Sequence, residues 1–108
     1  MNNKQTTDLP VNVEVLDGAM TITLNRPKAL NSLNLEMIRW VQKAMNEAAL
    51  NGSIRVVVLQ GVGDRAFCAG ADIKTLARAV KENQRDRALQ FYREEYDLDL
   101  CIHDFPKP

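Results

Sequence analysis

The feature that most constrains the fold is an unbroken apolar run in the middle of the chain, from Val56 to Leu59. Such a run predicts a strand covered on both faces, as in a parallel sheet. An amphipathic helix is predicted before it at Leu35 to Leu50, with Asn34 as N-cap and Asn51-Gly52 as the stop. The order of strand, helix and buried strand indicates a right-handed βαβ crossover.

A β-hairpin is predicted ahead of this helix. Val11, Val13 and Val15 alternate with polar residues, which is the period of a half-buried strand. Asp17-Gly18 supplies the positive-φ residues of a tight turn. The return strand ends at Pro27, which has no amide hydrogen for a ladder. Its apolar residues are Met20, Ile22 and Leu24.

Two further helices are expected after the apolar run, around Ile73 to Val80 and from Leu89 to His103. The polar stretch between them, Lys81 to Arg87, is expected to be solvated. The second helix carries apolar residues at steps of three or four. These are Leu89, Tyr92, Tyr96 and Leu100. The chain therefore reads as one α/β domain, residues 11–108, preceded by a polar N-terminal tail, residues 1–10.

Charge balance and cysteine usage exclude several classes of function. Fourteen Lys and Arg residues balance fourteen Asp and Glu residues, so no net field draws the chain to nucleic acid or to an anionic membrane. An anionic ligand must therefore be captured locally. No segment approaches the ~20 apolar residues of a membrane span. Cys68 and Cys101 are too few and too far apart for a disulfide framework or a zinc cluster, so no metal and a reducing cytoplasm are expected.

The segment Ala66 to Lys74 is the most informative one chemically. Small residues on both sides of Gly70 let a carbonyl ligand approach the main chain just before a helix begins. Amides at a helix start point outward and unpaired, so they can hold a developing oxyanion without a charged side chain. Small residues can equally serve close packing. The residues by themselves leave these two interpretations open.

Two motifs carry a resemblance to a known family. Asn25-Arg26-Pro27-Lys28-Ala29-Leu30-Asn31-Ser32-Leu33 resembles the N-R-P-x-x-x-N-A-L segment of the crotonase (enoyl-CoA hydratase/isomerase) superfamily. Ala66-Phe67-Cys68-Ala69-Gly70-Ala71-Asp72-Ile73-Lys74 resembles its A-F-x-A-G-x-D segment. The predicted helix and strand lie between them in the order the family requires. The resemblance implies the N-terminal portion of a crotonase-like ββα superhelical fold, a hairpin followed by a βαβ crossover.

The resemblance also implies roles for individual residues. In the family, the amide of the residue matching Ala71 donates one of two hydrogen bonds to the thioester oxygen of an acyl-CoA. No cofactor is implied, because coenzyme A is part of the substrate. The residues that match the coenzyme A site are Lys28, Ala29, Leu30, Ala69, Gly70, Ala71, Asp72, Ile73 and Lys74.

A third motif narrows the family. Residues 91–96 read Phe-Tyr-Arg-Glu-Glu-Tyr and resemble the F-x-R-E-E-Y stretch of 3-hydroxyisobutyryl-CoA hydrolases, in which the residue matching Glu95 contacts substrate. By spacing alone, the acidic residues would form a solvated helix face. One departure favours hydratases instead, since the hydrolases usually have a second glycine where this chain has Ala71.

Crotonase-type enzymes supply a second oxyanion amide and their catalytic carboxylates from segments after the one matched by Pro106-Lys107-Pro108. The expected function is therefore that of a partial domain, truncated before the central catalytic segment, of a 3-hydroxyisobutyryl-CoA hydrolase of valine degradation. Such a chain is expected to be inactive alone. The alternatives are part of an enoyl-CoA hydratase/isomerase, or a non-catalytic module that binds acyl-CoA or another protein. Homo-oligomers are expected, because the valine strand requires neighbours on both sides.

Overall fold

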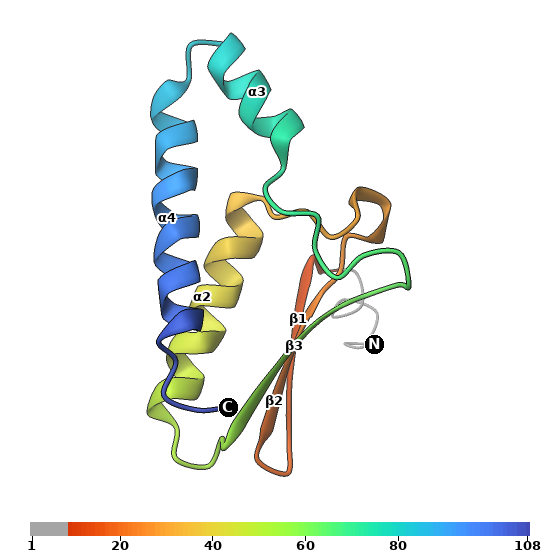
Figure 1. Cartoon of the computed structure of the whole chain (residues 1–108), viewed down its shortest axis with the longest axis vertical. Coiled ribbons are helices and arrows are strands. Elements are labelled where there is room, and N and C mark those ends of the chain that lie inside the picture. The colour runs from red at the N-terminus through yellow and green to blue at the C-terminus, as the bar shows by residue number, and fades with distance from the viewer. Residues whose placement is uncertain (1–8) are drawn as a thin grey trace.

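The computed structural model describes residues 9–108, so nearly all of the predicted tail at residues 1–10 lies outside the described part. Three strands form one sheet in the order β1 (Val11–Leu16), β2 (Ala19–Leu24), β3 (Val56–Gly61). The chain also forms three α-helices, α2 (Leu35–Leu50), α3 (Ile73–Lys81) and α4 (Arg85–His103), and a short 3-10 turn, η1 (Pro27–Ala29). Figure 1 shows α2 between the sheet and α4, with α3 at one end of the molecule. None of the described helices is both long and apolar enough to cross a membrane.

The hairpin and the crossover are both confirmed. β1 pairs with β2 in antiparallel register, and the turn between them places Asp17 and Gly18 at φ angles of 51° and 83°. Positive φ at both turn residues matches the twist of the two strands. β2 and β3 run parallel, and α2 makes the connection between them. The fold is therefore the expected α/β arrangement.

The core lies between the sheet and α2 and continues to α4. Asn34 begins α2, since its Oδ1 accepts a hydrogen bond from the Met37 amide at 2.9 Å. The sheet contributes Val11 of β1 and the three buried side chains of β2, and both helices contribute residues at three- and four-residue steps. The core side chains are Val11, Met20, Ile22, Leu24, Met37, Ile38, Val41, Ala44, Met45, Ala48, Ile54, Leu76, Ala88, Phe91 and Leu98.

The prediction that the valine strand is covered on both faces is wrong for the described residues. Val57 and Leu59 pack against the core, whereas Val58, on the opposite face, is 42% exposed. The alternating valines of β1 are likewise only partly covered, since Val11 is buried and Val13 and Val15 are exposed. The reason is that the described helices lie on one side of the sheet only, as Figure 1 shows.

The last helix differs from its prediction in start and in orientation. It begins at Arg85 rather than Leu89, so part of the predicted solvated stretch is helical, although its side chains are mostly exposed. The apolar residues used to predict the helix point outward, and Ala88, Phe91 and Leu98 face the core instead. An Arg39–Glu94 ion pair with two hydrogen bonds, of 2.8 and 2.9 Å, joins α2 to α4 in this orientation. The exposed apolar set is Leu89, Tyr92, Tyr96 and Leu100.

The C-terminal residues return to the outer edge of β3. The Val57 amide donates to the Pro108 carbonyl at 2.9 Å. Lys107 Nζ donates to the carbonyls of Ala48, Asn51 and Ile54 around the end of α2. The edge of β3 is thus already paired with main chain at its start. Amide directions alternate along a strand, so the Leu59 and Gly61 amides face the same edge.

Gly61 offers a test of the junction between β3 and the following loop. A Cβ at this position would collide with the Phe67 carbonyl oxygen and lie 2.7 Å from Asn31 Nδ2. We expect Gly61→Ala to lower the free energy of unfolding by about 1–3 kcal/mol, because a close-packed site has no room for a methyl group. Urea unfolding followed by circular dichroism measures this.

The matched control for this variant is Gly52→Ala, since no atom lies within 4 Å of a Cβ placed there. Its unfolding free energy should stay within about 0.5 kcal/mol of the parent chain. Equal unfolding midpoints for both variants would contradict the geometry at Gly61.

Candidate functional site

The structure brings the two motif segments of the predicted coenzyme A site together. Three backbone hydrogen bonds join them: the Ala69 amide donates to Leu30 O at 3.0 Å, the Leu33 amide to Gly70 O at 2.7 Å, and the Asp72 amide to Leu33 O at 2.8 Å. The last two form a parallel bridge centred on Leu33 and Ala71. Residues about forty positions apart in the sequence therefore form one continuous main-chain surface.

Asn31 holds the first of these loops in shape. Leu30 and Asn31 both have left-handed backbone angles, with φ of 54° and 56°. The Asn31 side chain is fully buried, and its Oδ1 accepts from the Arg26 amide at 2.8 Å. Its Nδ2 donates to the carbonyls of Val62 and Ala66, each at 3.0 Å. One amide group thus bonds three backbone groups in two separate loops and satisfies their hydrogen-bonding capacity.

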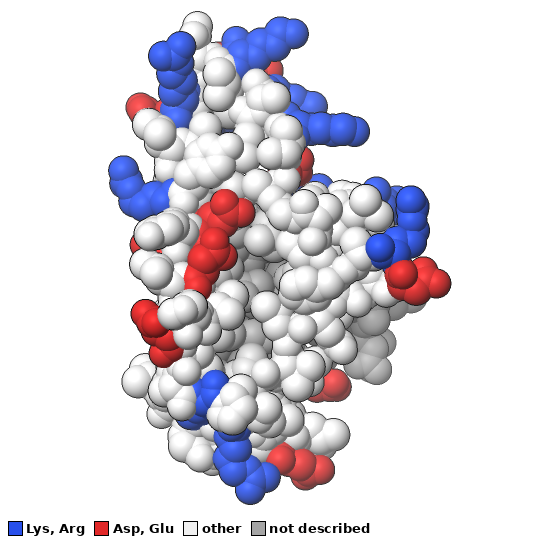
Figure 2. All heavy atoms as spheres, in the orientation of Figure 1, with Lys and Arg blue, Asp and Glu red and all other residues white. Residues whose placement is uncertain are grey.

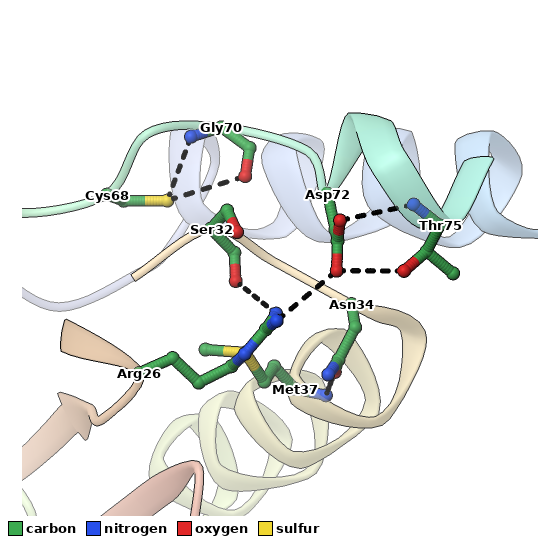
Figure 3. A network of polar contacts seen from close by, with 8 residues as sticks. All are labelled: Arg26, Ser32, Asn34, Met37, Cys68, Gly70, Asp72 and Thr75. Atoms are coloured by element: carbon green, nitrogen blue, oxygen red, sulfur yellow. Dashed lines mark hydrogen bonds and ion pairs between the residues drawn. The ribbon is translucent and has the colours of Figure 1, made fainter. Parts of the chain in front are cut away.

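Arg26 and Asp72 connect this loop to the start of α3 (Figure 3). Arg26 Nη1 donates to the Ser32 carbonyl at 2.9 Å, and Nη2 pairs with Asp72 Oδ2 at 3.3 Å. Asp72 is also the N-cap of α3, accepting from the amide and the hydroxyl of Thr75. Burial opposes ionisation of Asp72, but the hydrogen bonds from Thr75 and Arg26 outweigh it and lower the carboxyl pKa. Asp72 is therefore anchored to its own protein neighbours.

Cys68 and Gly70 shape the loop just before Ala71. The Gly70 amide donates to Cys68 Sγ at 3.4 Å (Figure 3). Gly70 has a φ of 98°, and a Cβ placed on it would meet no atom within 4 Å. Glycine is therefore required here for its backbone conformation and not for close packing.

The Ala71 amide has no hydrogen-bond partner among residues 9–108, although the amides on either side of it are both used. The bridge explains this. The Leu33 amide donates to Gly70 O and the Asp72 amide donates to Leu33 O, so the N–H of Ala71, which lies between Gly70 and Asp72, points away from Leu33. Ala71 is half-buried and lies directly before the α3 N-cap. An unpaired amide at this point is chemically able to bind a carbonyl or carboxylate oxygen.

The other predicted site residues are less closely gathered. Lys28, Ile73 and Lys74 are exposed, and Ala29 is half-buried in η1. Glu95 lies half-buried on α4, and no hydrogen bond or ion pair of the described residues joins it to the Ala71 loop. Burial, with the nearby charge of Asp99, raises the pKa of the Glu95 carboxyl.

Sequence reasoning gave no individual role to Arg26, Asn31 or Ser32, which build the loop. All three stand inside the first motif, but their residue types alone do not reveal which groups they contact. The one local signal was Asn31 itself, since asparagine accepts left-handed backbone angles more readily than most residues.

This arrangement is that of the N-terminal part of a crotonase-like fold. A solved structure titled carnitinyl-CoA dehydratase, from Mycobacterium thermoresistibile, aligns with 94% of this chain at a TM-score of 0.89 and 36% identity. The chain covers 29% of that structure. An enoyl-CoA hydratase from Rhodobacter sphaeroides aligns with 93% of this chain at a TM-score of 0.87 and 34% identity, and the chain covers 30% of it.

The chain belongs to the enoyl-CoA hydratase/isomerase family, whose model matches residues 19–108. Among curated proteins, it is 46% identical over 90 residues to the mitochondrial 3-hydroxyisobutyryl-CoA hydrolase of Xenopus tropicalis, covering 83% of this chain and 23% of that protein. The Rattus norvegicus protein of the same name is 39% identical over 106 residues, covering 98% of this chain and 27% of that protein. The chain thus spans about a quarter of the length of these relatives.

Asp72→Asn tests the link between Arg26 and α3. Asparagine can still cap the helix, but the charge that pairs with Arg26 is lost. We expect the variant to be less stable near neutral pH by about 0.5–1 kcal/mol, since the ion pair is partly exposed. The measurement is the unfolding free energy as a function of pH.

The pH dependence has a definite sign. The folded pKa of Asp72 is lowered from 3.8, so its ionisation stabilises the fold above pH 3.8, and this stability is lost as pH falls through the lower folded pKa. The difference between parent chain and variant should therefore shrink on acidification. Asp64→Asn, at an exposed loop position, is the control and should follow the parent curve. A constant gap at all pH values would count against the ion pair.

Proposed function

We propose that this chain provides the first half of an acyl-CoA thioester site. The observation that carries the proposal is the unpaired Ala71 amide, held at the start of α3 by the bridge to Leu33. A thioester enolate or a tetrahedral intermediate places negative charge on one oxygen. A fixed N–H aimed at that oxygen lowers the barrier by about 3 kcal/mol, because it needs no reorganisation when the charge develops.

Coenzyme A would lie along the surface formed by the two joined loops. Lys28 to Leu30 on one side and Ala69 to Lys74 on the other belong to one hydrogen-bonded unit. Lys28 and Lys74 are exposed at its margins, where their ammonium groups can attract the phosphates of coenzyme A. Asp72 contributes to this site through Arg26 and the helix start.

In its relatives, such a segment is part of a longer protein. For a protein of that kind containing this chain, we favour hydrolysis of 3-hydroxyisobutyryl-CoA, a step of valine degradation. The support is the names of the curated relatives and the half-buried Glu95, whose raised pKa suits a carboxyl group that exchanges protons with a substrate. A hydratase or isomerase is the second candidate, favoured by Ala71 and by the titles of the aligned structures. A second oxyanion donor and further carboxylates would complete either reaction.

The relatives' names place those proteins in mitochondria. Cys68 and Cys101 are unpaired here, which is compatible with the reducing cytoplasm expected from the sequence and equally with the mitochondrial matrix.

Self-association of the 108-residue chain is part of the proposal. Among residues 9–108, the outer edge of β3 is paired only near Val57, and Val58 and the apolar side chains Tyr96 and Leu100 of α4 are exposed. Unpaired edge amides and exposed apolar groups favour contacts between copies. Light scattering should therefore give a mass above that of one chain, rising with concentration. A stable monomer at high concentration would contradict this.

Acyl-CoA binding can be measured directly by following amide shifts in NMR spectra while acetyl-CoA is added. We expect shifts at Ala29, Leu30 and residues 69–74, with a dissociation constant no better than about 0.1–1 mM, because half of the site makes few contacts. Salt and Lys28→Ala should both weaken the shifts. Lys43→Ala, an exposed position on α2, is the matched control and should leave them unchanged. No shifts at millimolar ligand would favour the protein-interaction interpretation.

The same titration separates the two candidate reactions. The hydrolase proposal expects 3-hydroxyisobutyryl-CoA, but not crotonyl-CoA, to shift the Glu95 amide as well, and Glu95→Gln to reduce that effect while acetyl-CoA binding stays the same. The reverse selectivity would favour the hydratase. Steady thioester hydrolysis by the mass-verified 108-residue chain would contradict the expectation that it is inactive alone.

A further inference from the structure

A cleft lies between the start of α2, the inner side of α3 and the first half of α4. Its volume is about 560 Å³, which is within the usual range for small-molecule sites. The floor is apolar and belongs to the core, since it is made by Leu76, Ala79, Ala88 and Phe91, all buried, together with Leu35. Such a floor is suited to a hydrocarbon group.

Two arginines without partners line this cleft. Arg78 comes from α3 and Arg87 from the first turn of α4. Within residues 9–108, neither guanidinium makes a hydrogen bond or an ion pair. The third arginine of the cleft, Arg39, is already held by Glu94. Arg78 and Arg87 therefore have their full donor capacity available.

The carboxylates of the cleft leave its charge positive. Asp72 is occupied by Arg26 and Thr75, so Glu82 is the remaining acidic group in the lining. Residues 73–87, which include α3 and its connection to α4, contain five basic and two acidic residues. Figure 2 shows Lys and Arg side chains gathered at the end of the molecule where α3 lies, and acidic ones further along α4.

We infer that this cleft binds a small organic anion with an apolar body, namely a monocarboxylate with a hydrocarbon chain. A guanidinium presents paired N–H donors in the geometry that a carboxylate accepts. The apolar floor beside it gains from covering by a hydrocarbon chain and gains nothing from a bare inorganic ion. One end of the ligand lies at Arg78 and Arg87, and the other lies over Phe91 and Leu76.

This cleft adjoins the acyl-CoA site of the proposed function at Asp72 but shares no other predicted site residue with it. The cleft lies on the flank of α4 that carries Gln90, and Glu94 follows one turn later on the same flank. Glu95 follows Phe91 by one turn on the same face of α4 but does not itself line the cleft, and neither do Ala71 and Lys28. The two sites can therefore fail independently.

The test is an NMR titration of the 108-residue chain with sodium octanoate, in parallel with acetate, 1-octanol and inorganic phosphate. Octanoate should shift the amides of Leu76, Ala79, Ala88 and Phe91 in a saturable way. At the same concentrations the other three ligands should give smaller shifts, because acetate and phosphate lack the hydrocarbon chain and octanol lacks the charge. The double variant Arg78→Gln/Arg87→Gln should weaken octanoate binding about five- to tenfold. Both side chains are exposed, so the fold should be retained, and the spectrum without ligand checks this.

The matched control is Arg65→Gln/Arg85→Gln, which removes the same charge from exposed positions outside the cleft. It should bind octanoate like the parent chain. Equal binding by the two double variants, equal shifts with octanol, or shifts confined to residues outside the cleft would each overturn the inference. Acetyl-CoA shifts at residues 69–74 are read in the same samples, so loss of one site is distinguished from loss of the other.

Discussion

The buried side-chain amide of Asn31 is the interaction on which the rest of the site depends. Its three hydrogen bonds reach Arg26, Val62 and Ala66, which belong to the loop after β2 and to the loop after β3. The parallel strands end at the same edge of the sheet, so these loops meet there, but strands alone do not fix their conformations. Asn31 does so from the inside, in a left-handed conformation that most side chains would strain.

A fixed pair of loops explains how a main-chain group can become a functional one. Leu33 binds Gly70 O and the Asp72 amide, and this leaves the amide between them, that of Ala71, pointing outward. The Arg26–Asp72 ion pair and the Thr75 hydrogen bonds then hold the following helix against the same loop. In the proposed acyl-CoA site no catalytic side chain is needed at this point, since the surrounding hydrogen bonds fix the position of the amide. This is why small residues suffice around Ala71.

The elements that the sequence predicted best are those defined by local chemistry. The Asp17-Gly18 turn, the Asn34 cap and the step from β2 through α2 to β3 each follow from a few neighbouring residues. The orientation of α4 could not be predicted in the same way, because two sets of residues on it have helical spacing. The Arg39–Glu94 pair and the shape of Phe91 and Leu98 decide between them, and both are tertiary effects.

The same distinction applies to the candidate site. The two motif segments were predicted to belong together from resemblance, and the structure joins them by three backbone bonds. The roles of Arg26 and Asn31 were not predicted, because their partners lie up to 46 positions away and include the main-chain carbonyls of Ser32, Val62 and Ala66, which leave no trace in residue types. The exposure of Val58 was not predicted for a related reason. An apolar run indicates that both faces of a strand can be buried, but it does not show whether helices cover both faces of the sheet.

Charge is balanced over the whole chain but strongly segregated along α4. Arg85 and Arg87 lie in its first turn, whereas residues 94–104 contain five acidic residues and neither Lys nor Arg. A helix dipole favours the opposite order, and a misplaced exposed charge in the first or last turn costs about 0.3–1 kcal/mol at low ionic strength. Asp86 and His103 offset only part of this. Arg87 joins Lys74, Arg78 and Lys81 in making the α3 end of the molecule positive, which is the sign of charge that both proposed anion sites require.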